Sequence, residues 1–127
     1  MNTFLSTLKT EQTGKWTHNL LDDLIFEDEE LGTVTVPKGF TTDFASIRSL
    51  HNIFLFILYA LTSGYGNYAG TVHDFLYTTH STNSKDVSRK QADGVLYRAL
   101  RAEGIAKWRA WLFWAGVRVG GGKAYEN

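Results

Sequence analysis

Three residues near the middle of the chain have the types and the spacing of a proton-transfer site. The stretch "VHDFLY", residues 72–77, places His73 beside Asp74 and puts Tyr77 four positions after the histidine. On a helix, residues four apart share a face, whereas adjacent residues point about 100° apart. His73 and Tyr77 therefore face one way and Asp74 another. This arrangement lets the imidazole move a proton while the neighbouring carboxylate holds a cation or a hydroxyl group.

Asp93 is a fourth candidate, 20 residues after His73 and on the next predicted helix. It shares a helical stripe with Leu96 and Leu100, which predicts that its carboxylate points inward. A buried carboxylate needs a polar partner, and His73 on the preceding antiparallel helix is the predicted one. A histidine–aspartate hydrogen bond fixes the imidazole tautomer and raises its basicity. We therefore predict a His73–Asp93 pair, supported by Tyr77.

A purely structural interpretation of the same residues remains open. Buried aspartates often do no more than pair with arginines or helix ends, and Arg89 or Arg98 is placed to serve Asp93 in this way. The cluster would then stabilise the fold without any chemistry.

Composition excludes several classes of protein and of site. The 127 residues contain no cysteine, which rules out disulfides, thiolate metal sites and a cysteine nucleophile. The formal net charge is zero and no recognition-helix signature is visible, so binding to nucleic acid is disfavoured. The longest apolar run, Ile53 to Leu61, is far shorter than the roughly 20 residues that a membrane-spanning helix needs. We also expect no signal peptide, because the first residues lack a basic start followed by an apolar stretch.

The charge is distributed unevenly along the chain. Residues 1–84 carry four basic and nine acidic side chains, whereas residues 85–127 carry nine basic and four acidic ones. Such asymmetry is typical of a basic face for phosphates or lipid headgroups. The more ordinary prediction, which we favour, is that the acidic half docks against the basic half.

The predicted fold class is α+β, a small N-terminal antiparallel β hairpin or sheet packed on three or four C-terminal helices. We expect one domain over residues 1–127, with a β-rich part at about 16–46 and a helical part at 47–120. The stretch 19–40 has two apolar segments around an acidic turn, Glu27–Glu30, and is closed by Pro37 and Gly39.

Four helices are predicted after the hairpin. The first covers residues 47–64, and the second follows the glycine-punctuated stretch "GYGNYAG" and carries His73. The third has the clearest start, because Ser88 with Gln91 three residues later forms a capping box, and it ends at Gly104.

The last predicted helix, within residues 105–122, has an apolar stripe at helical spacing that contains two tryptophans. Such a stripe can enter a membrane interface, but core packing is its commoner role and is the one we predict. The residues of the stripe are Trp108, Trp111, Leu112, Ala115 and Val119.

Four motifs together resemble a known family. "VPKGFTTDFASI", "VHDFLY", "SRKQAD" and "KWRAWLFWAGVR" occur in the order found in a family of small proteins from tailed phages and prophages, described as domain of unknown function 1353. The resemblance covers about residues 20–120 and implies a phage context but no chemistry. One departure is Arg48, where that family usually has proline.

A second, local resemblance implies a reaction. The spacing His-Asp-x-x-Tyr on one helix and Ala-Asp on the next, within residues 70–100, is similar to compact secreted phospholipase A-two. The resemblance implies that His73 is the general base that activates water and that Asp74 binds calcium. It also implies that Asp93 orients His73, with Tyr77 in support.

The resemblance is incomplete at the calcium site. In phospholipase A-two a glycine-rich loop of carbonyl ligands lies well before the histidine, whereas "GYGNYAG" ends three residues before His73. Calcium takes six to eight oxygen ligands. Asp43, Thr42 and Asn67 are the further oxygen donors that we consider, with Asp43 as the second carboxylate.

The sequence therefore supports two main functions for a phage-encoded protein of the host cytoplasm or the virion. The first is metal-assisted hydrolysis of an ester, with phospholipid as the expected substrate class. The alternative is a non-catalytic virion protein, of the tail or of assembly, that uses the helical hairpin as a scaffold and other virion proteins as partners. A small host-directed protein is a third interpretation, to which no particular residue points.

Overall fold

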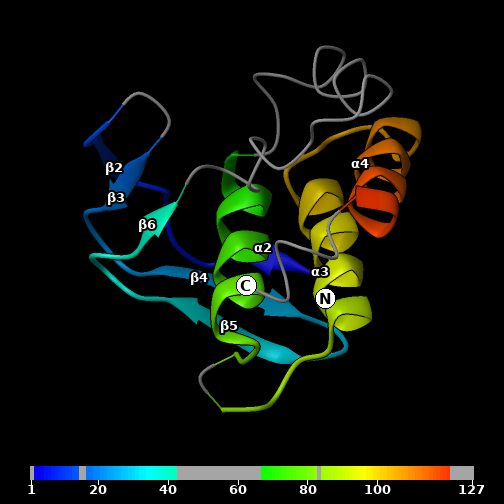
Figure 1. Cartoon of the computed structure of the whole chain (residues 1–127), viewed down its shortest axis with the longest axis horizontal. Helices are drawn as coiled ribbons and strands as arrows, with labels where there is room; N and C mark the ends of the chain where they lie inside the picture. The colour runs from blue at the N-terminus through cyan, green and yellow to red at the C-terminus, as the bar shows by residue number, and fades with distance from the viewer. Residues whose placement is uncertain (1, 15–16, 43–66, 83, 121–127) are drawn as a thin grey trace.

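The computed structural model describes residues 2–14, 17–42, 67–82 and 84–120, and it confirms the α+β fold class. The helix predicted over residues 47–64 lies outside the described residues. In the described part, strands precede three helices along the chain (Figure 1). The elements are β1 (Thr3–Phe4), β2 (Thr10–Gln12), β3 (His18–Leu20), β4 (Leu24–Asp28), β5 (Gly32–Val36), β6 (Thr41–Thr42), α2 (Asn67–Thr79), α3 (Arg89–Ala102) and α4 (Lys107–Gly120).

The predicted hairpin is formed by β4 and β5, which pair antiparallel with Phe26 opposite Val34. Side chains alternate between the two faces of a strand. Leu24 and Phe26 on β4 and Val34 and Val36 on β5 are accordingly buried, and the residues between them are more exposed. The alternation in the sequence thus gives the hairpin a single apolar face.

The acidic turn of the hairpin is shorter than predicted. β4 continues through Glu27 and Asp28, so the connection begins only after Asp28. The Oδ2 atom of Asp28 accepts hydrogen bonds from the backbone N–H groups of Glu30 (3.1 Å) and Leu31 (2.9 Å). Gly32 then takes a φ of 80°, a conformation that glycine adopts without strain.

The strands form two three-stranded sheets rather than one hairpin, in the orders β1-β4-β5 and β2-β3-β6. The predicted β-rich part, 16–46, was therefore too narrow, because β1 and β2 lie before it. These two strands have only two and three residues. Such short segments show no alternation, and their backbone pairing with β4 and β3 holds them in place.

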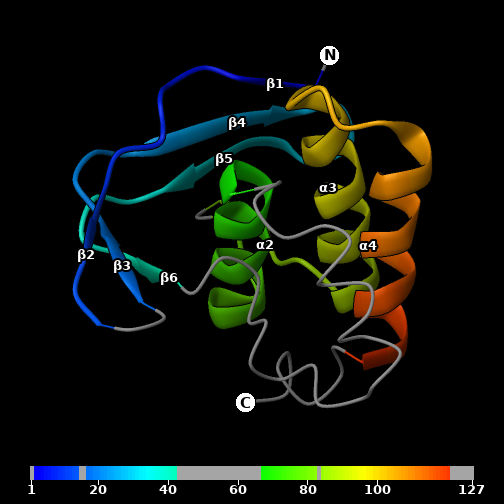
Figure 2. The ribbon, with the colours of Figure 1, turned by 90° about the horizontal axis from the view of Figure 1, so that it is seen from above.

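The three helices run in alternating directions, as the colours in Figure 1 show. The sheet β1-β4-β5 packs against α2 and α3, and α4 packs along α3 (Figure 2). The shared core joins the sheet to the first two helices. Its largest fully buried side chains include Leu24, Phe26, Val34, Phe75, Leu76, Leu96 and Leu100.

The predicted boundaries of α3 are confirmed. The Ser88 hydroxyl accepts from the Gln91 backbone N–H (3.1 Å), and the Gln91 side chain accepts from the Ser88 N–H (2.9 Å). The helix ends at Ala102, and Gly104 follows with a φ of 89°. Because the caps determine where α3 begins and ends, they place Asp93 one turn after the start of the helix.

The prediction that the tryptophan stripe of α4 packs in the core is wrong. Trp108 and Trp111 are 56% and 55% exposed, and Val119 is 73% exposed. Ala110 and Val117, on the other side of α4, are buried instead. Because both faces of α4 are apolar, its sequence pattern does not indicate which face packs inward.

Candidate functional site

His73 and Tyr77 lie on the face of α2 that packs against α3. Both side chains are buried, with residue exposures of 2% and 3%. Their ring centroids are 4.1 Å apart, as expected for side chains one helical turn from each other. Two aromatic polar groups are therefore held side by side in the interface between two helices.

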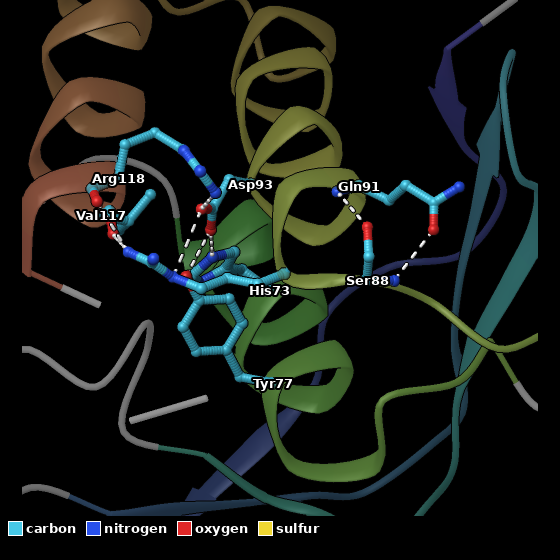
Figure 3. A network of polar contacts seen from close by, with 8 residues as sticks. His73, Tyr77, Ser88, Gln91, Asp93, Val117 and Arg118 are labelled. Carbon is cyan, nitrogen blue, oxygen red and sulfur yellow. Dashed lines mark hydrogen bonds and ion pairs between the residues drawn. The ribbon is translucent and has the colours of Figure 1, made fainter. Parts of the chain in front are cut away.

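Asp93 completes the cluster from α3, and its residue is 0% exposed. His73 Nε2 lies 2.8 Å from Asp93 Oδ1, and the Tyr77 hydroxyl donates to the same oxygen at 2.5 Å (Figure 3). The expected contact between positions 73 and 93 is thus present. It arises because the antiparallel α2 and α3 place the middle of one helix beside the first turns of the other.

Arg118, from the last turn of α4, is the residue that sequence reasoning missed. Its Nη1 donates to Asp93 Oδ2 at 2.8 Å, so the carboxylate has donors on both oxygens. Arg89 contributes indirectly: its Nη2 donates to the backbone carbonyls of Val117 (2.8 Å) and Arg118 (2.7 Å), and its Nε lies 4.0 Å from Asp93 Oδ2. Of the two arginines considered for Asp93, Arg89 is therefore near it.

Arg98, the other arginine considered, does not serve Asp93. Its Nε donates to Asp28 Oδ1 at 2.7 Å and its Nη2 donates to Asp28 Oδ2 at 3.1 Å. Its Nη1 also lies 2.5 Å from Glu30 Oε2. This group joins the acidic hairpin to the basic α3, in line with the expected docking of the two halves of the chain.

The electrostatics of the cluster favour one protonation state for Asp93 and one for Tyr77. Burial by itself raises the pKa of Asp93, but hydrogen bonds from His73, Tyr77 and Arg118 outweigh it and hold the pKa below its usual value. Burial, together with the hydrogen bond to Asp93, raises the pKa of the Tyr77 hydroxyl. Asp93 is therefore an anion and Tyr77 a neutral donor at neutral pH.

The ionised Asp93 determines which nitrogen of His73 must carry a hydrogen. An ionised carboxylate can only accept, so the Nε2 atom beside Asp93 Oδ1 carries the hydrogen. In an imidazole with a single hydrogen, the Nδ1 atom then keeps its lone pair. An imidazole oriented in this way by a carboxylate can accept a proton from water or from a hydroxyl group.

The metal-ligand candidates lie only partly within the described part of the chain. Asp74 lies on α2 and is 9% exposed. Asp43 lies outside the described residues. Thr42 is buried in β6, and Asn67 is exposed at the start of α2. In residues 2–14, 17–42, 67–82 and 84–120, no three histidine or carboxylate side chains are grouped to hold a metal ion. Calcium takes six to eight oxygens, so a complete site would need donors beyond these described side chains.

Glu103 is a further carboxylate, partly buried, that the sequence did not single out. It is the C-cap residue of α3, and its Oε1 accepts from the backbone N–H of Ala69 at 2.5 Å. That N–H is among the first of α2, where the helix leaves amide donors unsatisfied. Burial raises the pKa of Glu103 from 4.5 to about 7, although the Ala69 hydrogen bond opposes the shift. Glu103 therefore ties the start of the His73 helix to the end of α3.

Glu103→Gln is expected to remove a pH dependence of stability. The pKa of Glu103 is higher in the folded chain, so the folded state binds the Glu103 proton more tightly than the unfolded state does. The free energy of unfolding of the protein therefore falls as pH rises from 4.5 to about 7. Glutamine keeps the acceptor for Ala69 without the charge, so the variant is expected to be about 1–3 kcal/mol more stable at pH 8. Urea unfolding at several pH values measures this. Glu11→Gln, at an exposed position, is the control, and equal pH slopes for all three proteins would contradict the prediction.

The fold and the cluster define a class: a small α+β protein with an oriented histidine–carboxylate pair between two antiparallel helices. The chain belongs to the family described as "Protein of unknown function (DUF1353)", whose model matches residues 4–117. Comparisons with curated proteins and with solved structures found no match. Among the described helices, none has the length and apolar character needed to cross a membrane.

Proposed function

We propose that this chain is a phage-encoded hydrolase that cleaves ester bonds, with phospholipids as its substrate class. The observation that carries the proposal is the 2.8 Å contact between His73 Nε2 and a buried, ionised Asp93. This contact leaves Nδ1 of His73 as a base. The choice of phospholipid as substrate follows the local resemblance to phospholipase A-two. The phage setting follows the resemblance to the wider family.

The proposed reaction uses His73 in both halves of the hydrolysis. Nδ1 of His73 takes a proton from water as the water oxygen bonds to the ester carbonyl carbon, and Asp93 stabilises the imidazolium that forms. The tetrahedral intermediate then collapses, the bond to the alkoxide oxygen breaks, and the imidazolium gives its proton to that oxygen. The products are an alcohol and a fatty acid. Tyr77 and Arg118 hold the Asp93 carboxylate in place.

Calcium is part of the proposal as the cofactor, with Asp74 and Asp43 as its carboxylate ligands. When bound, such an ion would polarise the ester carbonyl. None of the proton transfers above is assigned to the ion, so the histidine chemistry and the metal requirement are separate questions for experiment.

The test compares fatty-acid release by the wild type, His73→Asn and the matched control His18→Asn. Substrates are phosphatidylglycerol in mixed micelles and a soluble short-chain ester, each with excess calcium or with EDTA. We expect His73→Asn to reduce turnover by about 10²–10⁴-fold, the usual contribution of a general base, while His18→Asn keeps its activity. Chelation is expected to abolish turnover as well. If the wild type and His73→Asn release fatty acid equally slowly, the enzymatic proposal is wrong.

A second candidate function follows from how completely the cluster is buried. Asp93 is 0% exposed and accepts hydrogen bonds from α2 and α4. Such a group would also serve as a structural clamp in a non-catalytic virion protein of the tail or of assembly. Mass spectrometry of gradient-purified phage particles would detect the chain there. Its presence in particles, together with no turnover, would favour this alternative.

A further inference from the structure

α4 carries an apolar stripe that points away from the core. The stripe consists of Trp108, Trp111, Leu112, Ala115 and Val119. Each residue of a helix advances about 100°, so these five positions fall within an arc of about 100°. Trp108, Trp111 and Val119 are the most exposed of them, at 56%, 55% and 73%. A contiguous exposed apolar patch with polar residues at its rim often marks an interaction surface.

Two open hollows adjoin the stripe, and Trp111 lines both. One, of about 530 Å³, is lined by Tyr97, Lys107, Trp108, Trp111 and Leu112. The other, of about 330 Å³, is lined by Gly94, Tyr97, Arg98, Trp111 and Trp114. Aromatic side chains with a basic residue at the edge thus form a broad, uneven surface over α3 and α4.

The charged residues on α4 are all of one sign. The α4 sequence contains three basic residues and no acidic residue. Lys107 is exposed beside the larger hollow, and the Arg109 guanidinium carbon lies 5.0 Å from the Trp108 ring centroid. On α3, Lys90 and Arg101 are also exposed. The surface is therefore both apolar and basic.

We propose that this stripe of α4 is a membrane-binding surface that recognises bilayers rich in anionic phospholipid. Indole rings are amphipathic and favour the headgroup level, whereas lysine and arginine side chains extend to lipid phosphates. A second copy of the chain is a poorer occupant, because two basic faces would repel each other in a symmetric dimer. The helix would lie parallel to the membrane plane.

The surface is connected to the His73–Asp93 cluster through α4 itself. Arg118, which donates to Asp93, follows Trp111 by seven residues on nearly the same side of the helix, a distance of about 10 Å along the axis. Docking of the stripe would bring that end of the cluster toward the lipid. In this respect the inference deepens the proposed function and rests on it, but binding itself can be measured without turnover.

The test uses vesicles of non-hydrolysable ether-linked lipids, either with phosphatidylglycerol or with phosphatidylcholine alone, in a co-sedimentation assay. The proteins are the wild type, Trp108→Ser/Trp111→Ser, Lys107→Gln and His73→Asn. Leu21→Ser is the control, because Leu21 is 44% exposed and follows β3, on the opposite side of the molecule from α4 in both views (Figures 1 and 2).

We expect the wild type to bind anionic vesicles at least tenfold more tightly than neutral ones. The double tryptophan variant is expected to bind at least about tenfold more weakly, because it loses two large apolar anchors. Lys107→Gln is expected to bind about fivefold more weakly, with the difference lost in high salt. His73→Asn and Leu21→Ser should bind like the wild type, and circular dichroism confirms that each variant is folded.

Three results would overturn the inference. The first is equal vesicle binding by the wild type and the double tryptophan variant. The second is a concentration-dependent dimer, measured by sedimentation equilibrium without lipid, that the double variant abolishes. The third is tryptophan fluorescence that iodide cannot quench in the lipid-free monomer, which would mean that the chain itself covers the stripe. Because the lipids are not hydrolysed, binding without activity would refute only the proposed function, and activity on the soluble ester without binding would refute only this inference.

Discussion

Asp93→Asn is expected to lower the free energy of unfolding by about 3–5 kcal/mol and to reduce ester turnover by about 10⁴-fold. The first value is typical of removing one member of a buried charge pair. The second is the loss seen in a serine-protease triad when the orienting aspartate becomes asparagine. Both effects come from one carboxylate that accepts hydrogen bonds on each of its oxygens.

The reason lies in the number of acceptors. Oδ1 of Asp93 accepts from Tyr77 and lies beside His73 Nε2, and Oδ2 accepts from Arg118. Asparagine has one oxygen and one NH₂ group. Its NH₂ group must therefore replace either Oδ1 or Oδ2 and face a hydrogen-bond donor there. If the NH₂ group faces Arg118, two donors oppose each other. If it faces His73, the imidazole must carry its hydrogen on Nδ1, and that nitrogen is then no longer a base.

Stability in acid provides a second measure of the same substitution. The pKa of Asp93 is lower in the folded chain than its value of 3.8 in the unfolded chain. The ionised carboxylate therefore stabilises the fold fully at pH values above 3.8. That contribution is lost as the pH falls through the lowered folded value. Asp93→Asn should therefore be less stable than the wild type at neutral pH, and the difference should shrink in strong acid.

Asp22→Asn is the matched control, because it makes the same chemical change at a side chain that is 60% exposed. Exposed ion pairs contribute little, so its stability should stay within about 0.5 kcal/mol of the wild type. Turnover is compared under conditions in which every variant is fully folded. A folded Asp93→Asn that retains wild-type kcat would show that the cluster is structural only.

The His73–Asp93 contact could be predicted because it depends on local signals. The capping box at Ser88 sets where α3 starts, and helical periodicity turns Asp93 inward. The short connection after α2 then forces the two helices to lie antiparallel, with His73 on the facing side. Each step uses residues close together in the sequence.

Arg118 could not be predicted in the same way. Arg118 lies 25 residues after Asp93 in the sequence, and their contact exists only because α4 packs along α3. The sequence of α4 is apolar on two faces, so the pattern cannot decide which face docks. The same ambiguity led to the wrong assignment of Trp108 and Trp111 to the core, since Ala110 and Val117 occupy that position instead.

The second prediction of large effect concerns the ion pair that fastens the hairpin to α3. Arg98→Met is expected to lower the free energy of unfolding by about 3–5 kcal/mol. The Asp28 side chain is 0% exposed, and Arg98 donates two hydrogen bonds to it in a bidentate pair. Methionine fills similar space but leaves the Asp28 carboxylate buried without its cation.

The Asp28 carboxylate keeps some of its hydrogen bonds in the Arg98→Met variant. These remaining bonds limit the expected loss of stability. Its Oδ2 still accepts from the backbone N–H groups of Glu30 and Leu31 in the hairpin turn. The turn itself should therefore persist. What is lost is the link to α3, together with the charge that compensates a buried anion.

Glu30→Gln and Lys90→Met are controls that separate the Asp28–Arg98 ion pair from general effects of charge. Urea unfolding measures the stability of these two variants and of Arg98→Met. Glu30 also pairs with Arg98, but its side chain is 67% exposed, so its loss should cost less than about 1 kcal/mol. Lys90 is an exposed cation on the same helix, and its replacement should change stability by no more than about 0.5 kcal/mol. Arg98→Met should thus exceed both controls several-fold. If it matches them, the prediction is wrong and the hairpin must be held to α3 by apolar packing alone.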